Sequence, residues 1–319
     1  MSCNKPLTAY QPNKGGQPVF EPPSPRKKLF FKEIKLPCRQ CIGCRVDKQA
    51  AWAARLLHEA QTHDLSLFIT LTYDPENVPL DFGLHHEDFQ GFMKRLRYYC
   101  KEQKIRFFMC GEYGTKGSRP HFHAILFGLK LDDLKEYKTH TKSKAQYDAA
   151  GRLVKPAETY SYYTSETLSE IWGKGQVLIG YATRETMTYV SGYMLKEQVL
   201  NAKGDYSIVD PETGEYYERK KPYIRMSTNP GIGAEWFKEF KDDVFPHDYV
   251  IVDGQKKQVP DYYLRKLAEI DPDLAEQIKQ KRLEALKTEE VQEKKTPEKM
   301  KNKEFIQERK IKLFGSSKL

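Results

Sequence analysis

Residues 119–128 read RPHFHAILFG, and this stretch carries more information on fold and chemistry than any other part of the chain. Side chains alternate between the two faces of a strand, so His121 and His123 share one face while Phe122 points to the other. The apolar residues that follow predict packing on both sides of the strand. Two imidazoles on one rigid face predict a metal-binding platform, although a pair of hydrogen-bonded sheet histidines would give the same pattern.

A second apolar stretch, residues 105–112, ends in the carboxylate of Glu112 and leads into a turn rich in glycine. If the two stretches form a hairpin, Glu112 lies across from the histidine pair and completes a His, His, Glu set with open positions. Such a set suits Mg²⁺ or Mn²⁺ bound to phosphate oxygens, and ligand type alone leaves Zn²⁺ and Fe²⁺ open. The alternative for Glu112 is an exposed carboxylate at the end of a strand.

Residues 186–196, TMTYVSGYMLK, predict a helix with two phenols and an ammonium on one face. Helical spacing places Tyr189, Tyr193 and Lys196 within roughly 60° of one another. A phenol has a pKa near 10, so it attacks a phosphodiester well only when a metal ion activates the phosphate. The products would be a 5′-phosphotyrosine and a free 3′-hydroxyl, with Lys196 stabilising developing charge. The alternative is a pair of tyrosines that pack their rings and expose their hydroxyls.

A cluster of cysteines precedes these segments. Cys38, Cys41 and Cys44 are spaced so that all three thiols can reach one metal ion, and Cys3 is the obvious fourth ligand for a structural Zn²⁺. An iron–sulfur cluster is the weaker interpretation, because a fourth cysteine is missing nearby. Reduced, partly buried cysteines remain the alternative to zinc.

The composition is that of a globular, basic chain. It has 319 residues, 39% of them hydrophobic, and a formal net charge of +9. The positive charge suits a polyanionic partner whose binding weakens with salt. No apolar run is long enough for a membrane span or a signal core, which predicts a soluble protein. The six cysteines are expected to be reduced, with Cys100 and Cys110 in the core.

The order of these patterns predicts an α+β fold, an antiparallel sheet with helices packed on one face. Expected helices cover 46–63, 86–103 and 186–196, and expected strands cover 67–73, 105–112, 121–128 and 176–182, with a polar insertion at about 131–165. Four regions are predicted: an N-terminal arm with the cysteine cluster (1–45), a catalytic domain (46–200), an accessory hairpin and helix (201–260), and a charged helical or disordered tail (261–319).

Three motifs in order support a family resemblance. They are FITLTYD at 68–74, the histidine motif 121–123 with the preceding Gly111 and Glu112, and Tyr189-x-x-x-Tyr193-x-x-Lys196. The set resembles the HUH endonucleases that initiate rolling-circle replication, and more narrowly the replication initiators of gokushovirus-type microviruses. The resemblance runs from the cysteine cluster to residue 233 and implies a ferredoxin-like core. In such a core the two histidines and Glu112 would hold the metal, and the tyrosines would be the nucleophiles.

The resemblance implies an enzyme that nicks one strand at the phage origin, stays attached through a tyrosine, and later joins the displaced strand into a circle. Its expected partners are single-stranded and origin DNA with a host helicase and other replication proteins, and its expected location is the cytoplasm of the bacterial host. The first motif, with Thr70, Thr72 and Tyr73, is expected to have a structural or origin-contacting role. The alternatives are a plasmid relaxase or transposase of the same chemistry, a noncatalytic metal-stabilised DNA-binding module, and a metal-dependent hydrolase of small molecules.

Overall fold

The computed structural model describes the chain from residue 3 to residue 315, except for 115–118, 144–145, 148–151, 156–157, 201–205, 211–212, 246, 253, 290–292 and 294–295. The chain divides into two compact units. One unit consists of residues 53–242, and the other combines residues 1–52 with 243–319. Each unit is described by itself.

A seven-stranded antiparallel sheet forms the centre of the unit 53–242. Its strand order is β13-β4-β5-β3-β10-β9-β6. The strands are β3 (Ser66–Thr72), β4 (Arg106–Tyr113), β5 (Pro120–Phe127), β6 (Lys135–Ser143), β9 (Glu158–Thr164), β10 (Val177–Tyr181) and β13 (Tyr223–Met226). The predicted α+β class with a large antiparallel sheet is therefore confirmed.

The register of the three central strands follows the predicted hairpin. Strand β5 pairs with β4 so that His121 is directly opposite Glu112, and it pairs with β3 so that His123 is opposite Thr70. Phe122 points to the other face and is fully buried. The alternation of side chains along β5 thus separates an apolar face from a polar one.

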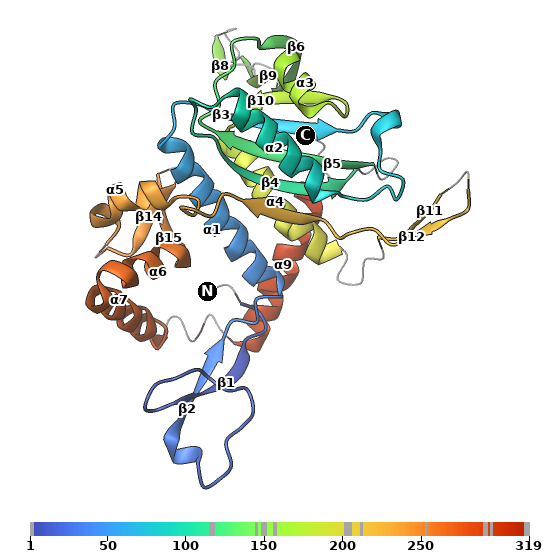
Figure 1. Ribbon diagram of the computed structural model, residues 1–319. Helices are drawn as coiled ribbons and strands as arrows, with labels where there is room; N and C mark the ends of the chain where they lie inside the picture. Colours follow the sequence, from blue (N-terminus) through green and yellow to red (C-terminus); the bar gives the residue numbers. More distant parts are fainter. Residues whose placement is uncertain are drawn as a thin grey trace. The chain divides into compact units, whose positions relative to one another are not determined.

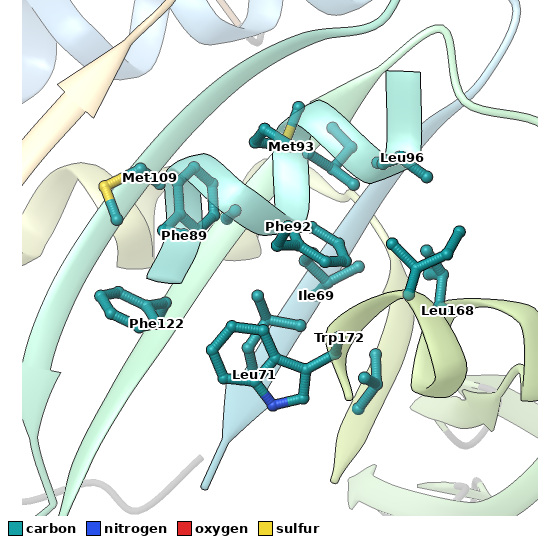
Figure 2. Close-up of a cluster of buried hydrophobic side chains, with 14 of the residues drawn as sticks. Ile69, Leu71, Phe89, Phe92, Met93, Leu96, Met109, Phe122, Leu168 and Trp172 are labelled. Carbon is teal, nitrogen blue, oxygen red and sulfur yellow. The ribbon is translucent and has the colours of Figure 1, made fainter. Parts of the chain in front are cut away.

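Helices α2 (His86–Tyr99) and α3 (Glu166–Trp172) cover the apolar face. Figure 2 shows aromatic side chains of α2 directed toward Phe122 of the sheet and Trp172 of α3. The ring centroids of Phe89 and Phe122 are 5.8 Å apart, and those of Phe92 and Trp172 are 6.1 Å apart. Burying rings of this size contributes a large part of the stability of a core.

Helix α4 (Arg184–Leu200) lies against the opposite face, where it contacts β4 and β5 (Figure 1). The expectation of helices on one face therefore holds for α2 and α3 but not for α4. The reason is that the residues expected to act with the histidines lie on this helix, and the histidines point away from the α2 side. Both faces of the central strands are covered as a result.

A buried ionic cluster joins the end of α1 (Ile42–Gln61) to the sheet and to the segment before α5 (Ala234–Val244). The carboxylate of Glu59 accepts hydrogen bonds from the Arg106 guanidinium and from the backbone N–H of Gly233, the latter at 2.6 Å. Next to Glu59, the ring of His58 stacks on Trp236 with centroids 3.6 Å apart. These contacts fix α5 to the unit through one buried charge pair.

The polar insertion contains strands that the sequence patterns did not reveal. Strands β6 and β9 pair and extend the large sheet beyond β10, and β7 (Gln146–Tyr147) pairs with β8 (Leu153–Lys155). A short hairpin of β11 (Ile208–Val209) and β12 (Tyr216–Tyr217) is present where a polar hairpin was expected.

The other unit contains two small antiparallel hairpins and three helices among its described residues. The hairpins are β1 (Leu7–Pro12) with β2 (Phe31–Leu36), and β14 (Tyr249–Val252) with β15 (Gln255–Gln258). The helices are α6 (Asp261–Ile270), α7 (Pro272–Ala285) and α9 (Pro297–Gly315). Tyr263 and Ile278 are buried, so α6 and α7 are packed rather than simply solvated. In the described part of the chain, every helix is too short or too polar to cross a membrane.

Candidate active site

The three residues predicted to hold a metal ion lie together on the polar face of the central strands. One ligand atom each from Glu112, His121 and His123 can be chosen so that all lie within 4.8 Å of one another. The Nε2 atoms of His121 and His123 are 2.9 and 3.0 Å from the same oxygen, Oε1 of Glu112. Antiparallel pairing of β4 with β5 produces this convergence, because directly opposed residues share a face.

The outer nitrogen of each imidazole has its own hydrogen-bond partner. Nδ1 of His121 donates to the backbone carbonyl of Arg119 at 3.2 Å, and Nδ1 of His123 lies 2.8 Å from Oγ1 of Thr70. Such partners fix the orientation of metal-binding histidines and leave Nε2 free to bind. The sequence patterns did not identify Thr70 as a partner of the site, although its register on the neighbouring strand offered the signal.

The electrostatics of the cluster favour a cation. Burial raises the pKa of Glu112, but hydrogen bonds from His121 and His123 outweigh burial and hold the pKa below its ordinary value. The carbonyl of Arg119 can only accept, so a neutral His121 carries its proton on Nδ1 and aims the lone pair of Nε2 at a carboxylate. Two acceptors at this separation attract each other only through a proton or a metal ion. The donor set of two imidazoles and one carboxylate therefore fits a divalent cation.

Tyr189 of α4 packs against this cluster. Its ring lies edge-on to the ring of His123, with centroids 5.8 Å apart, and Phe68 of β3 stacks on His123 at 5.4 Å. Burial, and then the negative charge of Glu112, raise the pKa of the Tyr189 phenol. The structure thus places one of the two predicted nucleophiles beside the histidines, with its proton retained at neutral pH.

The other two predicted catalytic residues fall on a part of α4 whose side chains are not described. The helix itself runs to Leu200, but the side chains of Tyr193 and Lys196 lie outside the described residues. Their roles remain predictions from the sequence.

The first motif contributes to both faces of the sheet. Phe68 and Thr70 touch His123, as described above. Tyr73 is buried, and its hydroxyl donates a 2.7 Å hydrogen bond to Asp88 of α2. This contact has a structural role, because it joins the end of β3 to the helix that covers the apolar face.

The predicted cysteine ligands are also brought together. The sulfur atoms of Cys3, Cys38, Cys41 and Cys44 all lie within 4.8 Å of one another. Cys100 and Cys110 are buried away from this group, as the sequence predicted. The structure therefore contains two clusters able to hold a metal ion among its described residues, one of mixed nitrogen and oxygen ligands and one of sulfur ligands.

Comparison with known proteins gives consistent relatives. The family model of replication-associated proteins of the ORF2 type matches residues 66–198, which include the strands and the helix that form the site. The replication-associated protein ORF2 of Spiroplasma virus 4 is 31% identical over 288 residues, covering 84% of this chain and 80% of that protein. The replication-associated protein VP4 of Bdellovibrio phage phiMH2K is 30% identical over 271 residues, covering 82% of this chain and 76% of that protein.

A third relative, the replication-associated protein ORF4 of Chlamydia phage 1, is 28% identical over 242 residues, covering 74% of this chain and 55% of that protein. No solved structure matches the chain. The likeness to the first two relatives extends over most of both partners, well beyond the short motifs. The chain therefore belongs to the family of phage replication-associated proteins, and within it to the microvirus-type replication initiators.

Proposed function

We propose that this protein starts rolling-circle replication by cutting one strand at the phage origin and joining the new 5′ end to a tyrosine. The observation that carries the proposal is the convergence of His121 and His123 on one oxygen of Glu112, with the ring of Tyr189 against His123. The likeness to HUH endonucleases supports a ferredoxin-like catalytic core built on β3, β4 and β5. Single-stranded and origin DNA would be the substrate, and a host helicase and other replication proteins in the bacterial cytoplasm would be the partners.

Glu112, His121 and His123 would hold Mg²⁺ or Mn²⁺. When bound, the ion would polarise the scissile phosphate and offset the charge of Glu112. The protein itself orients the ligands, because Thr70 and the carbonyl of Arg119 hold the two imidazoles by their outer nitrogens. Phe68 and Tyr189 close one side of His123 with aromatic rings and limit the access of water to it.

The cutting step exchanges one phosphodiester for another. Oη of Tyr189 attacks the phosphorus, the bond from phosphorus to the 3′-oxygen breaks, and the proton lost by the phenol is balanced by the proton gained at the 3′-hydroxyl. No other reactant is consumed, so the step can run backward to rejoin the strand. Tyr193 would act as the second nucleophile and Lys196 would stabilise the developing charge, as the resemblance implies.

A covalent adduct assay tests the proposal. The full-length protein is mixed with labelled single-stranded DNA from the phage origin and Mn²⁺, then run on a denaturing gel. We expect a labelled band at the mass of the protein plus DNA, absent with EDTA and absent for the Tyr189→Phe, Tyr193→Phe double variant. The matched control is the Tyr98→Phe, Tyr99→Phe double variant, because both tyrosines are exposed on α2 over the other face of the sheet.

The outcomes separate the alternatives. DNA binding without an adduct under any metal would indicate a noncatalytic DNA-binding module and would overturn the proposal. An adduct that survives in a His121→Ala, His123→Ala variant would show that the metal site is not where we place it. An adduct formed on plasmid transfer origins rather than on phage origin DNA would indicate a relaxase.

A further inference from the structure

The cysteine cluster lies at the base of the β1–β2 hairpin. Cys3 precedes β1 and Cys38 follows β2, whose closing pair is Leu7 with Leu36. Cys41 and Cys44 lie at the beginning of α1. The cluster therefore connects both ends of the hairpin to the first turn of a helix.

The distances between the sulfur atoms match a tetrahedral metal site. Sγ of Cys3 lies 3.7 Å from Sγ of Cys38 and 3.9 Å from Sγ of Cys41. Four sulfurs at about 2.3 Å from a central zinc ion lie about 3.8 Å from one another, whereas a disulfide needs about 2.05 Å. All six cysteines of the chain are free thiols, so none of the four is used for a disulfide.

Backbone N–H groups point at the same sulfur atoms. Cys41 donates to Sγ of Cys38 at 3.3 Å, Cys38 to Sγ of Cys3 at 3.3 Å, and Asn4 to Sγ of Cys41 at 3.2 Å. Arg39, between the first two cysteines of the cluster, has a φ of 61°, which turns the chain so that both thiols face inward. Donors aimed at sulfur stabilise thiolate, which is the form that binds metal.

The hairpin has little else to hold it. Of its twelve strand residues only Ala9 is buried, and isolated two-stranded hairpins are marginally stable in water. Next to Cys3, the Asn4 amide donates to Gln307 at 3.1 Å and Lys5 pairs with Glu304 at 3.0 Å, both on α9. Loss of order at Cys3 would therefore loosen contacts to the last helix of the same unit.

We propose that Cys3, Cys38, Cys41 and Cys44 form a closed structural Zn²⁺ site that holds the base of the β1–β2 hairpin to the beginning of α1. All four positions are thiolates, which leaves no open position for substrate and distinguishes the site from the His, His, Glu centre. The proposal stands independently of the proposed nicking activity.

Metal analysis of the full-length protein, purified without chelators, tests the site. We expect about one zinc ion per chain, retained in the His121→Ala, His123→Ala variant and lost in Cys38→Ser. Co²⁺ replacing zinc should give the visible bands of tetrahedral thiolate coordination. Cys100→Ser is the matched control, because it removes a buried cysteine outside the cluster and should leave the zinc content unchanged.

Hydrogen exchange provides a readout that does not depend on a variant folding. Removal of zinc with a strong chelator should speed amide exchange in β1 and β2 and leave β3, β4 and β5 unchanged. Wild-type protein without zinc, bound iron in its place, or zinc lost with the histidines but not with Cys38 would each overturn the proposal. Unchanged exchange in β1 and β2 after zinc removal would contradict the structural role.

Discussion

The hydroxyl of Thr70 lies 2.8 Å from Nδ1 of His123, while Nε2 of the same ring faces Glu112 at 3.0 Å. One imidazole thus links a neighbouring strand to the centre of the candidate site. Thr70→Val keeps the shape of the side chain and removes the hydroxyl, so Nδ1 of His123 loses its partner. Because such partners typically account for about 10- to 100-fold in metal affinity or activity, the Mn²⁺ concentration for half-maximal nicking should rise about tenfold or more.

Two comparisons make the Thr70 experiment specific. Thr70→Ser restores a hydroxyl and should recover most of the metal affinity. Thr72→Val is the matched control, because Thr72 lies on the same strand opposite His121, and no hydrogen bond from its side chain to a histidine occurs among the described residues. An unchanged Mn²⁺ requirement in Thr70→Val would show that the hydroxyl does not orient the ring.

Glu112→Gln replaces a charged oxygen ligand with a neutral amide of the same size. We expect the variant to fold and to require at least about tenfold more Mn²⁺ for adduct formation, since a ligand should matter at least as much as its supporting partners. Nicking titrated against Mn²⁺ measures the effect, with Glu235→Gln on α5 as the control. If the Mn²⁺ requirement does not change, another carboxylate supplies the third ligand.

The paired tyrosines predict a difference between cutting and release. Each single variant, Tyr189→Phe or Tyr193→Phe, should still form an adduct with an oligonucleotide, because one phenol remains on the same face of the helix. Release of a circle requires one tyrosine to hold the old 5′ end while the other attacks, so single variants should fail to produce circular strands. A Tyr189→Phe variant that replicates and circularises normally would leave Tyr189 with a packing role only.

The buried histidine of α1 predicts a dependence of stability on pH. Burial lowers the pKa of His58 from 6.5 to about 4, so the folded protein keeps this ring neutral while the unfolded chain takes up a proton below pH 6.5. Stability is therefore fully present above pH 6.5 and falls as the pH drops to 4, by about 3 kcal/mol for this group. His58→Phe preserves the stack on Trp236 and removes the titration.

Urea unfolding of the two proteins between about pH 4 and pH 7, the window in which His58 titrates, measures its contribution. The free energy of unfolding of the wild type should fall relative to that of His58→Phe as the pH decreases, while nearby groups such as Glu59 and His63 titrate in both proteins. Parallel curves would contradict the prediction.

Glu59 and Arg106 form a buried pair whose loss should be costly. Their side chains are 1% and 6% exposed, so Glu59→Ala leaves a buried, unpaired guanidinium and should destabilise the protein by about 3–5 kcal/mol. The exposed pair of Asp64 and Lys130 provides the control, and Asp64→Ala should have no measurable effect. Recovery of stability in Glu59→Ala, Arg106→Leu would confirm that the unpaired charge is the cause.

The arrangement of β4 and β5 could be predicted because it depends on local patterns. Alternation determined the face of His121 and His123, and a glycine-rich turn between two apolar stretches indicated the hairpin that the structure contains. The helix of Tyr189 was visible from its spacing, and its position over the histidines followed from the motif resemblance rather than from any pattern in the helix.

The remaining features depend on contacts that leave little trace in the sequence. Strands β6 and β9 extend the large sheet past β10, and the described side chains of both are mostly exposed or half-buried, so the usual alternation of apolar and polar residues is missing. The pairing of Thr70 with His123 needs the register between β3 and β5, which single-strand patterns do not give. The burial of Tyr263 and Ile278 depends on the packing of α6 and α7 within a segment dominated by charge.

The alternation of β5 also limits how relatives of this protein can diverge. Phe122 is fully buried between two histidines that point the other way. Insertion or deletion of one residue within Pro120–Phe127 would move the following side chains to the opposite face, bringing an imidazole into the core and an apolar group to the metal ligands. Genetic drift along this strand should therefore proceed by substitution at constant length, and length changes should accumulate in the loops beyond its ends.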